Sequence, residues 1–153
     1  MKKARFLTAI ALVLTAGATS VQAHDDAYLD TQKAPNGGQL RMAGAYHLEL
    51  VVDPSTAQAA DKPVVVYVTD HAGQKVPTEG ATGTATLLAA KAKATITLVP
   101  DGDNRLKGSG HYASTPDLKA VVTVIRKNQA PETARFTPLV STNGASMEHQ
   151  GKH

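Results

Sequence analysis

Cysteine and tryptophan are absent from this chain of 153 residues, which has only two phenylalanines and four tyrosines. Without cysteine no disulfide can form, so the domain must be held together by packing alone. No thiolate is available to a metal ion either. The scarcity of aromatic residues predicts a core of valine, leucine, isoleucine and alanine. It also argues against a substrate surface lined with aromatic rings.

Membrane-length apolar runs are absent too. The opening run FLTAIALVLTAGA, residues 6–18, is too short for a spanning helix, which needs about 18 or more apolar residues. It follows the basic start MKKAR and precedes VQA at residues 21–23, an order typical of a cleaved secretory signal peptide. We therefore predict that residues 1–23 are removed, and that the mature chain begins with His24 in the periplasm and has no membrane anchor.

The mature chain also lacks an excess of charge of one sign. The complete sequence has 16 Lys+Arg against 13 Asp+Glu. Lys2, Lys3 and Arg5 leave with the signal peptide, so 13 basic and 13 acidic residues remain and the formal net charge is zero. Because nucleic-acid-binding domains are typically basic, the charge favours neither a nucleic acid nor an anionic membrane as partner.

Familiar catalytic motifs are also absent from the sequence. There is no G-x-S-x-G, no H-E-x-x-H and no P-loop. The segment GSGH at 108–111 places a serine near a histidine, but no acid that would orient the histidine is evident. We predict that the protein is not an enzyme.

Short runs rich in β-branched residues dominate the mature chain. YHLELVV at 46–52 alternates in polarity, and comparable runs occupy 38–43, 63–70, 83–90, 94–100, 105–110, 118–127 and 132–138. Gly, Pro, Asp or Asn separates the runs, and no segment after residue 23 keeps a helical period over three turns. We predict an all-β fold over residues 35–138, an antiparallel immunoglobulin-like sandwich of seven to eight short strands.

The same alternation predicts the core and its limits. We expect eight side chains to be buried: Leu48, Leu50, Val64, Val66, Ile96, Leu98, Val122 and Phe136. Residues 24–34 and 139–153 lack alternation and are mostly polar. We predict that both are flexible arms.

Histidines are the candidate functional residues, and all six follow the signal peptide. His47 faces away from the leucines of its strand and is expected to be half exposed, either in a surface hydrogen bond or as a metal ligand. His71, in TDHAGQ, is expected to be an ordinary turn residue. For His111, in a glycine-rich loop beside Tyr112, both interpretations stay open.

Two chain ends concentrate metal-binding groups. The C-terminal MEHQGKH contains Met147, His149 and His153; imidazole suits Cu(II), Zn(II) and Ni(II), and thioether suits Cu(I). Cleavage would give His24 a free α-amine with a pKa near 7.7–8.0 beside its imidazole, so one residue could chelate a metal. A third nitrogen would come from His47, His111 or the tail. Alternatively, the tail is simply polar and His24 is an accident of cleavage.

A family resemblance points in the same direction. Residues 34–52, 67–88 and 118–138 resemble a family of small exported proteins found with heavy-metal efflux systems, and a related segment of the periplasmic adaptor subunits of those pumps. The most specific features are Gly37–Gly38 and Tyr46-His47-x-Glu49. Members often have histidine where this chain has Asn36, and an amide is a poor copper ligand. The resemblance implies a periplasmic context and a pump adaptor as partner.

Three functions compete on this basis. The first is a periplasmic buffer or carrier for a metal, with copper favoured over zinc or nickel and with ligands among His24, His47, His111, Met147, His149 and His153. The second is a metal-free interaction module that docks on a pump adaptor through a sheet edge. The third is a histidine-brace copper redox protein that uses His24. The first requires the chain ends, whereas the second leaves them dispensable.

Overall fold

The computed structural model describes residues 25–140, which form a nearly all-β domain. Its elements are α1 (Asp26–Asp30), β1 (Gln39–Ala43), β2 (Tyr46–Val52), β3 (Ala60–Thr69), β4 (Thr82–Ala89), β5 (Ala92–Pro100), β6 (Arg105–Tyr112), β7 (Lys119–Ile125) and β8 (Glu132–Phe136). Every strand overlaps a run predicted from the sequence, so the all-β antiparallel prediction is confirmed. The predicted signal peptide and nearly all of the predicted C-terminal arm lie outside the described residues.

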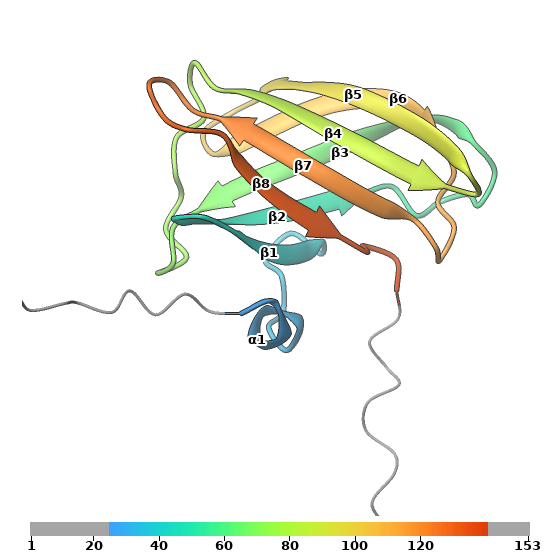
Figure 1. Ribbon diagram of the computed structural model, residues 1–153, viewed down its shortest axis with the longest axis horizontal. Coiled ribbons are helices and arrows are strands. Elements are labelled where there is room, and N and C mark those ends of the chain that lie inside the picture. Colours follow the sequence, from blue (N-terminus) through green and yellow to red (C-terminus); the bar gives the residue numbers. More distant parts are fainter. Residues whose placement is uncertain (1–24, 141–153) are drawn as a thin grey trace, which may run out of the picture.

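The eight strands form one antiparallel sheet in the order β1-β2-β3-β6-β5-β4-β7-β8. The sheet folds over where β5 and β6 meet, since they pair only at Val99–Lys107 and Pro100–Leu106. Figure 1 shows the two resulting layers, β1-β2-β3-β6 and β5-β4-β7-β8, packed face to face. The backbone N–H of Thr137 donates to Gln39 Oε1 over 2.8 Å, which brings the two ends of the sheet together into a barrel-like shape.

The core lies between these layers. All eight predicted core residues are buried, with no side chain more than 3% exposed. One end of the barrel also buries a charge: Lys62 Nζ donates to the carbonyl of Thr56 over 3.0 Å and to Ser114 Oγ over 2.6 Å, and lies 4.6 Å from the centre of the Tyr112 ring. These contacts replace water around the ammonium group, as a buried charge requires.

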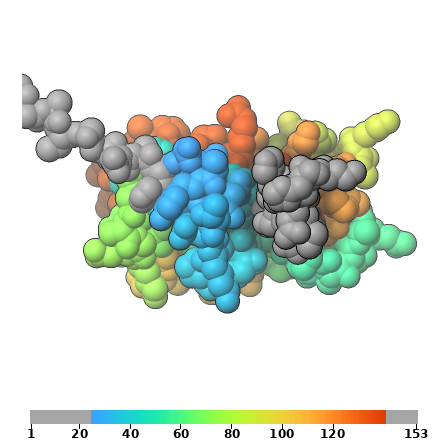
Figure 2. Space-filling view, turned by 90° about the horizontal axis from the view of Figure 1, so that it is seen from below, coloured from blue at the N-terminus to red at the C-terminus, as the bar shows by residue number. Residues whose placement is uncertain are grey.

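The N-terminal segment departs from its prediction. Residues 24–34 were expected to form a flexible arm, but within them α1 occupies Asp26–Asp30 and buries Leu29 to 3% exposure. Asp25 caps the helix by accepting from the N–H of Tyr28 over 2.8 Å. Figure 2 shows α1, in blue, lying across the face of the domain seen from below. Within residues 25–140, no helix is long and apolar enough to cross a membrane.

Two acidic side chains attach α1 to the outer edge of β1. Asp30 Oδ1 lies 2.6 Å from Arg41 Nη1, and Asp26 Oδ1 accepts from the N–H of Met42 over 3.1 Å. Arg41 itself is buried, so this ion pair is shielded from solvent on one side. The start of the described chain is therefore fixed beside β1.

Candidate functional site

The outer face of β2 carries the candidate site. His47 is only 7% exposed and Glu49 only 3%, although both point away from the core leucines. The prediction that His47 is half exposed is therefore wrong. The reason is that two loops fold over this face: residues 35–38 cover Glu49, and residues 70–74 cover His47.

The first loop closes on the Glu49 carboxylate. Oε1 accepts from the backbone N–H of Asn36 over 2.8 Å and of Gly38 over 3.0 Å, and Oε2 accepts from Asn36 Nδ2 over 2.8 Å. A Cβ on Gly38 would lie 2.3 Å from the carbonyl oxygen of Leu50, so only glycine lets the loop lie this close to β2. Gly37 has a φ of +77°, which also favours glycine. The Gly37–Gly38 pair and Glu49 are thus parts of one arrangement, in which Asn36 is a hydrogen-bond donor.

The second loop brings His71 onto His47. Asp70 Oδ1 accepts from the N–H groups of Ala72 over 2.9 Å and Gln74 over 2.8 Å, which folds the chain into a tight turn after β3. This turn stacks the two imidazole rings, with their centroids 5.0 Å apart and their planes 26° from parallel. His71 is a turn residue as predicted, but it also packs on His47, a contact that sequence reasoning missed.

Met42 is the cross-strand neighbour of His47. The two residues are directly opposite in the β1–β2 register, across a hairpin that pairs Ala43 with Tyr46. Because the N–H of Met42 donates to Asp26, it cannot donate to β2, and Met42 and His47 form a non-hydrogen-bonded pair. Such pairs hold their side chains closest together. The thioether of Met42 is therefore the cross-strand neighbour of the His47 imidazole, and sequence reasoning missed it as well.

A cavity of about 310 Å³ opens beside these residues. His47 and Glu49 line it together with Tyr67, Lys75 and Asn104. Asn104 Nδ2 donates to the carbonyl of Val68 over 3.0 Å, so its side chain is fixed by β3. In the described part of the chain, no group of three or more His, Asp or Glu side chains forms a ready-made metal site. The described residues alone thus supply two imidazoles to this face.

His111 lies far from this cluster. Its Nδ1 is 3.2 Å from Asp61 Oδ1, and the two residues are paired in the β3–β6 register. His47 pairs with Thr69 at the opposite end of β3. The eight residue-to-residue steps from Asp61 to Thr69 correspond to about 26 Å of extended strand. One ion therefore cannot bind His47 and His111 together.

The remaining predicted ligands, His24, Met147, His149 and His153, lie outside the described residues. Comparisons with known proteins add nothing to the geometry: no family model, curated protein or solved structure matches this chain. The resemblance to efflux-associated proteins therefore stays a prediction. The arrangement of side chains on the outer face of β2 is the basis for the functional argument.

Proposed function

We propose that the mature protein is a periplasmic metal-binding protein, with copper favoured, that acts as a buffer or carrier in heavy-metal tolerance or efflux. The observation that carries this proposal is the stacked His47–His71 pair beside Met42. Imidazoles suit Cu(II), and a thioether suits Cu(I), so the cluster offers ligands for both oxidation states. Zinc and nickel compete for the imidazoles and are tested alongside.

The Glu49 carboxylate is not a ligand in this proposal. Its two oxygens already accept three N–H groups from the loop at 36–38. It lies two residues from His47 on the same face of β2, about 7 Å along the strand. Its negative charge at that distance stabilises a cation held by the imidazoles. Glu49 therefore has two roles in this proposal: its hydrogen bonds hold the loop at 36–38 in place, and its negative charge stabilises the bound cation electrostatically.

Completion of the site is assigned to His24. Asp26 is fixed beside Met42, and Met42 is the cross-strand partner of His47. His24 precedes Asp26 by two residues, so its Cα lies at most about 7.6 Å from the Cα of Asp26. In this proposal the free α-amine and the imidazole of His24 bind the ion held by the His47–His71 pair. His149, His153 and Met147 are assigned to a second, weaker ion, because ordering a tail costs free energy.

The test is a Cu(II) titration of protein that begins at His24, followed by electron paramagnetic resonance. The variants are His47→Gln, His71→Gln and a form with one glycine added before His24, which moves the amine but keeps the imidazole. The matched control is His111→Gln, at the far end of β3. We expect the first three to weaken the tighter site at least about tenfold and to change its spectrum, as loss of a ligand does.

Other outcomes separate the alternatives. If His111→Gln weakens binding as much as His47→Gln, the cluster on β2 is not the metal site. If the added glycine alone has no effect, the α-amine is not a ligand and His24 follows the cleavage site by accident. If none of Cu(II), Zn(II) and Ni(II) binds, the proposal fails and the metal-free interaction module takes its place.

A further inference from the structure

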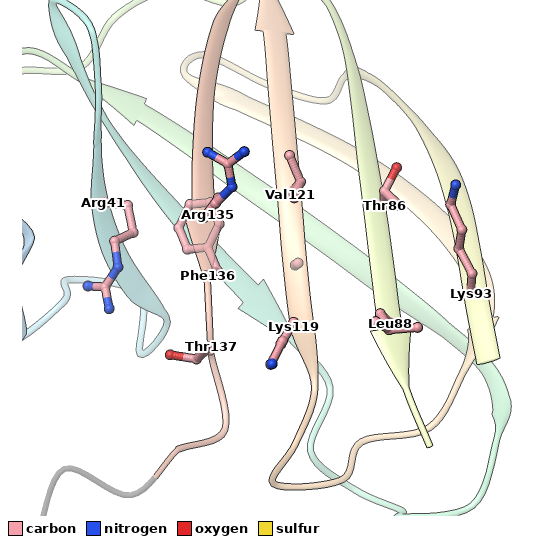
Figure 3. A pocket seen from close by; sticks show the side chains of 10 residues that line it. Arg41, Thr86, Leu88, Lys93, Lys119, Val121, Arg135, Phe136 and Thr137 are labelled. Carbon is pink, nitrogen blue, oxygen red and sulfur yellow. The ribbon is translucent and has the colours of Figure 1, made fainter. Parts of the chain in front are cut away.

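The layer opposite to His47 carries a larger cavity, a groove of about 600 Å³ on the outer face of β4, β7 and β8 (Figure 3). Its floor is apolar and partly open to solvent, with Leu88 46% and Val121 37% exposed. In the strand register, Leu88 lies between Lys93 on β5 and Lys119 on β7. The groove is thus an apolar floor with cationic side chains on both sides.

The charge in this groove is of one sign. None of its lining residues is acidic, and Lys93, Lys119 and Arg135 form no ion pair with any described residue. The fourth cation, Arg41, is already paired with Asp30. The nearest acid to Lys119 along the chain is Asp117, whose pKa is lowered mainly by the neighbouring side chain of Thr115 and, to a smaller extent, by Lys119.

This local excess of positive charge does not follow from the composition. The chain without its signal peptide has equal numbers of basic and acidic residues. Yet three cationic side chains from β5, β7 and β8 surround Leu88 and Val121, with Arg135 directly beside Val121 in the register. An apolar floor would bind the hydrocarbon part of a ligand, and unpaired cations beside it would bind a negative charge. The face therefore matches a ligand that is apolar along its length and anionic at one end.

The size and lining of the groove favour a single small molecule as its ligand. An apolar floor suits an alkyl chain, and the cations beside it suit a carboxylate. The volume lies in the usual range of small-molecule sites, about 300–1,000 Å³. We infer that this groove binds a monomeric amphiphilic anion, a medium- or long-chain alkyl carboxylate, with the chain over Leu88 and Val121 and the carboxylate at Lys119 and Arg135. The guanidinium of Arg135 can hold a carboxylate through two parallel hydrogen bonds.

The test is calorimetric titration of the protein beginning at His24 with sodium dodecanoate below its micelle concentration. Dodecyltrimethylammonium, with the same chain and the opposite charge, is the ligand control. We expect one dodecanoate to bind at least about tenfold more tightly than the cation, and more weakly as salt screens the lysines. Lys119→Gln should weaken binding about two- to fivefold, the effect of one exposed charge pair. Val121→Glu should abolish binding.

Lys107→Gln is the matched protein control, because Lys107 is an exposed strand lysine on β6, in the other layer. It should bind dodecanoate like the unmodified protein. The inference is overturned if both amphiphiles bind equally, if neither binds, or if Lys107→Gln and Lys119→Gln have the same effect. Tighter binding to anionic vesicles than to the monomer would make a lipid surface the occupant instead. If the protein dimerises and Val121→Glu abolishes the dimer, the occupant of the groove is a second copy of the chain. If dodecanoate binds only after deletion of residues 141–153, the occupant is the chain's own tail.

Discussion

Replacing Gly38 with alanine tests how strongly the loop over Glu49 stabilises the domain. The new Cβ would lie 2.3 Å from the carbonyl oxygen of Leu50 and 2.9 Å from a methyl group of Val51. Backbone contacts this short do not occur, so the loop must lift away from β2. Lifting stretches the hydrogen bonds from the N–H groups of Asn36 and Gly38 to the buried carboxylate.

The expected cost follows from those bonds. A hydrogen bond to a charged group contributes about 1.5–3 kcal/mol, so two weakened bonds give an upper limit of about 3–6 kcal/mol. Water that enters under the lifted loop recovers part of this. We therefore expect Gly38→Ala to lower the free energy of unfolding by about 2–4 kcal/mol, measured by urea denaturation at neutral pH.

Gly73→Ala is the matched control for this substitution. Gly73 has a φ of +77°, but no atom lies within 4 Å of the position that a Cβ would take there, so alanine is penalised only for its backbone conformation. That penalty is about 1–2 kcal/mol. If Gly38→Ala proves no more destabilising than Gly73→Ala, the close approach of the loop to Glu49 does not stabilise the fold and the reasoning is refuted.

Four further predictions concern the core, the buried lysine and pH. Leu50→Ala should lower the free energy of unfolding by about 2–5 kcal/mol in urea, and a smaller loss would mean that the site collapses around the missing methyl groups. Lys62→Met should cost about 2–3 kcal/mol in the same assay, because Ser114 Oγ and a backbone carbonyl lose their buried donor; an unchanged midpoint would show that packing alone suffices there. The pKa of Asp117 is held low mainly by the neighbouring side chain of Thr115, so its contribution to stability is present above about pH 4 and lost as the pH falls further. Asp117→Asn should therefore flatten the fall in melting temperature over that acidic range, and a fall as steep as before would contradict this. Cu(II) affinity should decrease from about pH 7.5 to about pH 5.5, because imidazoles and an α-amine must lose protons to bind; a flat titration would indicate carboxylate or thioether ligands.

The strands were predictable because the signal is local. In YHLELVV the alternation of Leu48 and Leu50 with polar residues defines a strand and its core face, and the structure confirms both. The helix α1 was not predictable in the same way. Five residues are too few to show a helical period, and only Leu29 of the segment packs inward. The capping residue Asp25 was the available signal.

The site depends on contacts between distant segments, so less of it could be predicted. Alternation assigns His47 to solvent, and nothing local shows that a turn 24 positions later, at His71, covers it. Met42 had a usable signal: a two-residue hairpin between Ala43 and Tyr46 places Met42 opposite His47. The two-residue alternation of a strand shows which residues share one of its faces. Which loop covers that face is known only from the tertiary structure.

The attachment of α1 to β1 has a consequence for association. An edge strand exposes N–H and C=O groups that recruit strands from other chains. Here Asp26 Oδ1 accepts from the N–H of Met42, so one outward backbone group of β1 is already in use; at the other end of β1, the side chain of Gln39 accepts from the backbone N–H of Thr137. A partner that added a strand at β1 would first have to displace the helix and break the Arg41–Asp30 ion pair. The short helix α1 therefore protects the edge of β1 against pairing with strands of other molecules. A partner that docks by strand addition would have to pair with another part of the sheet.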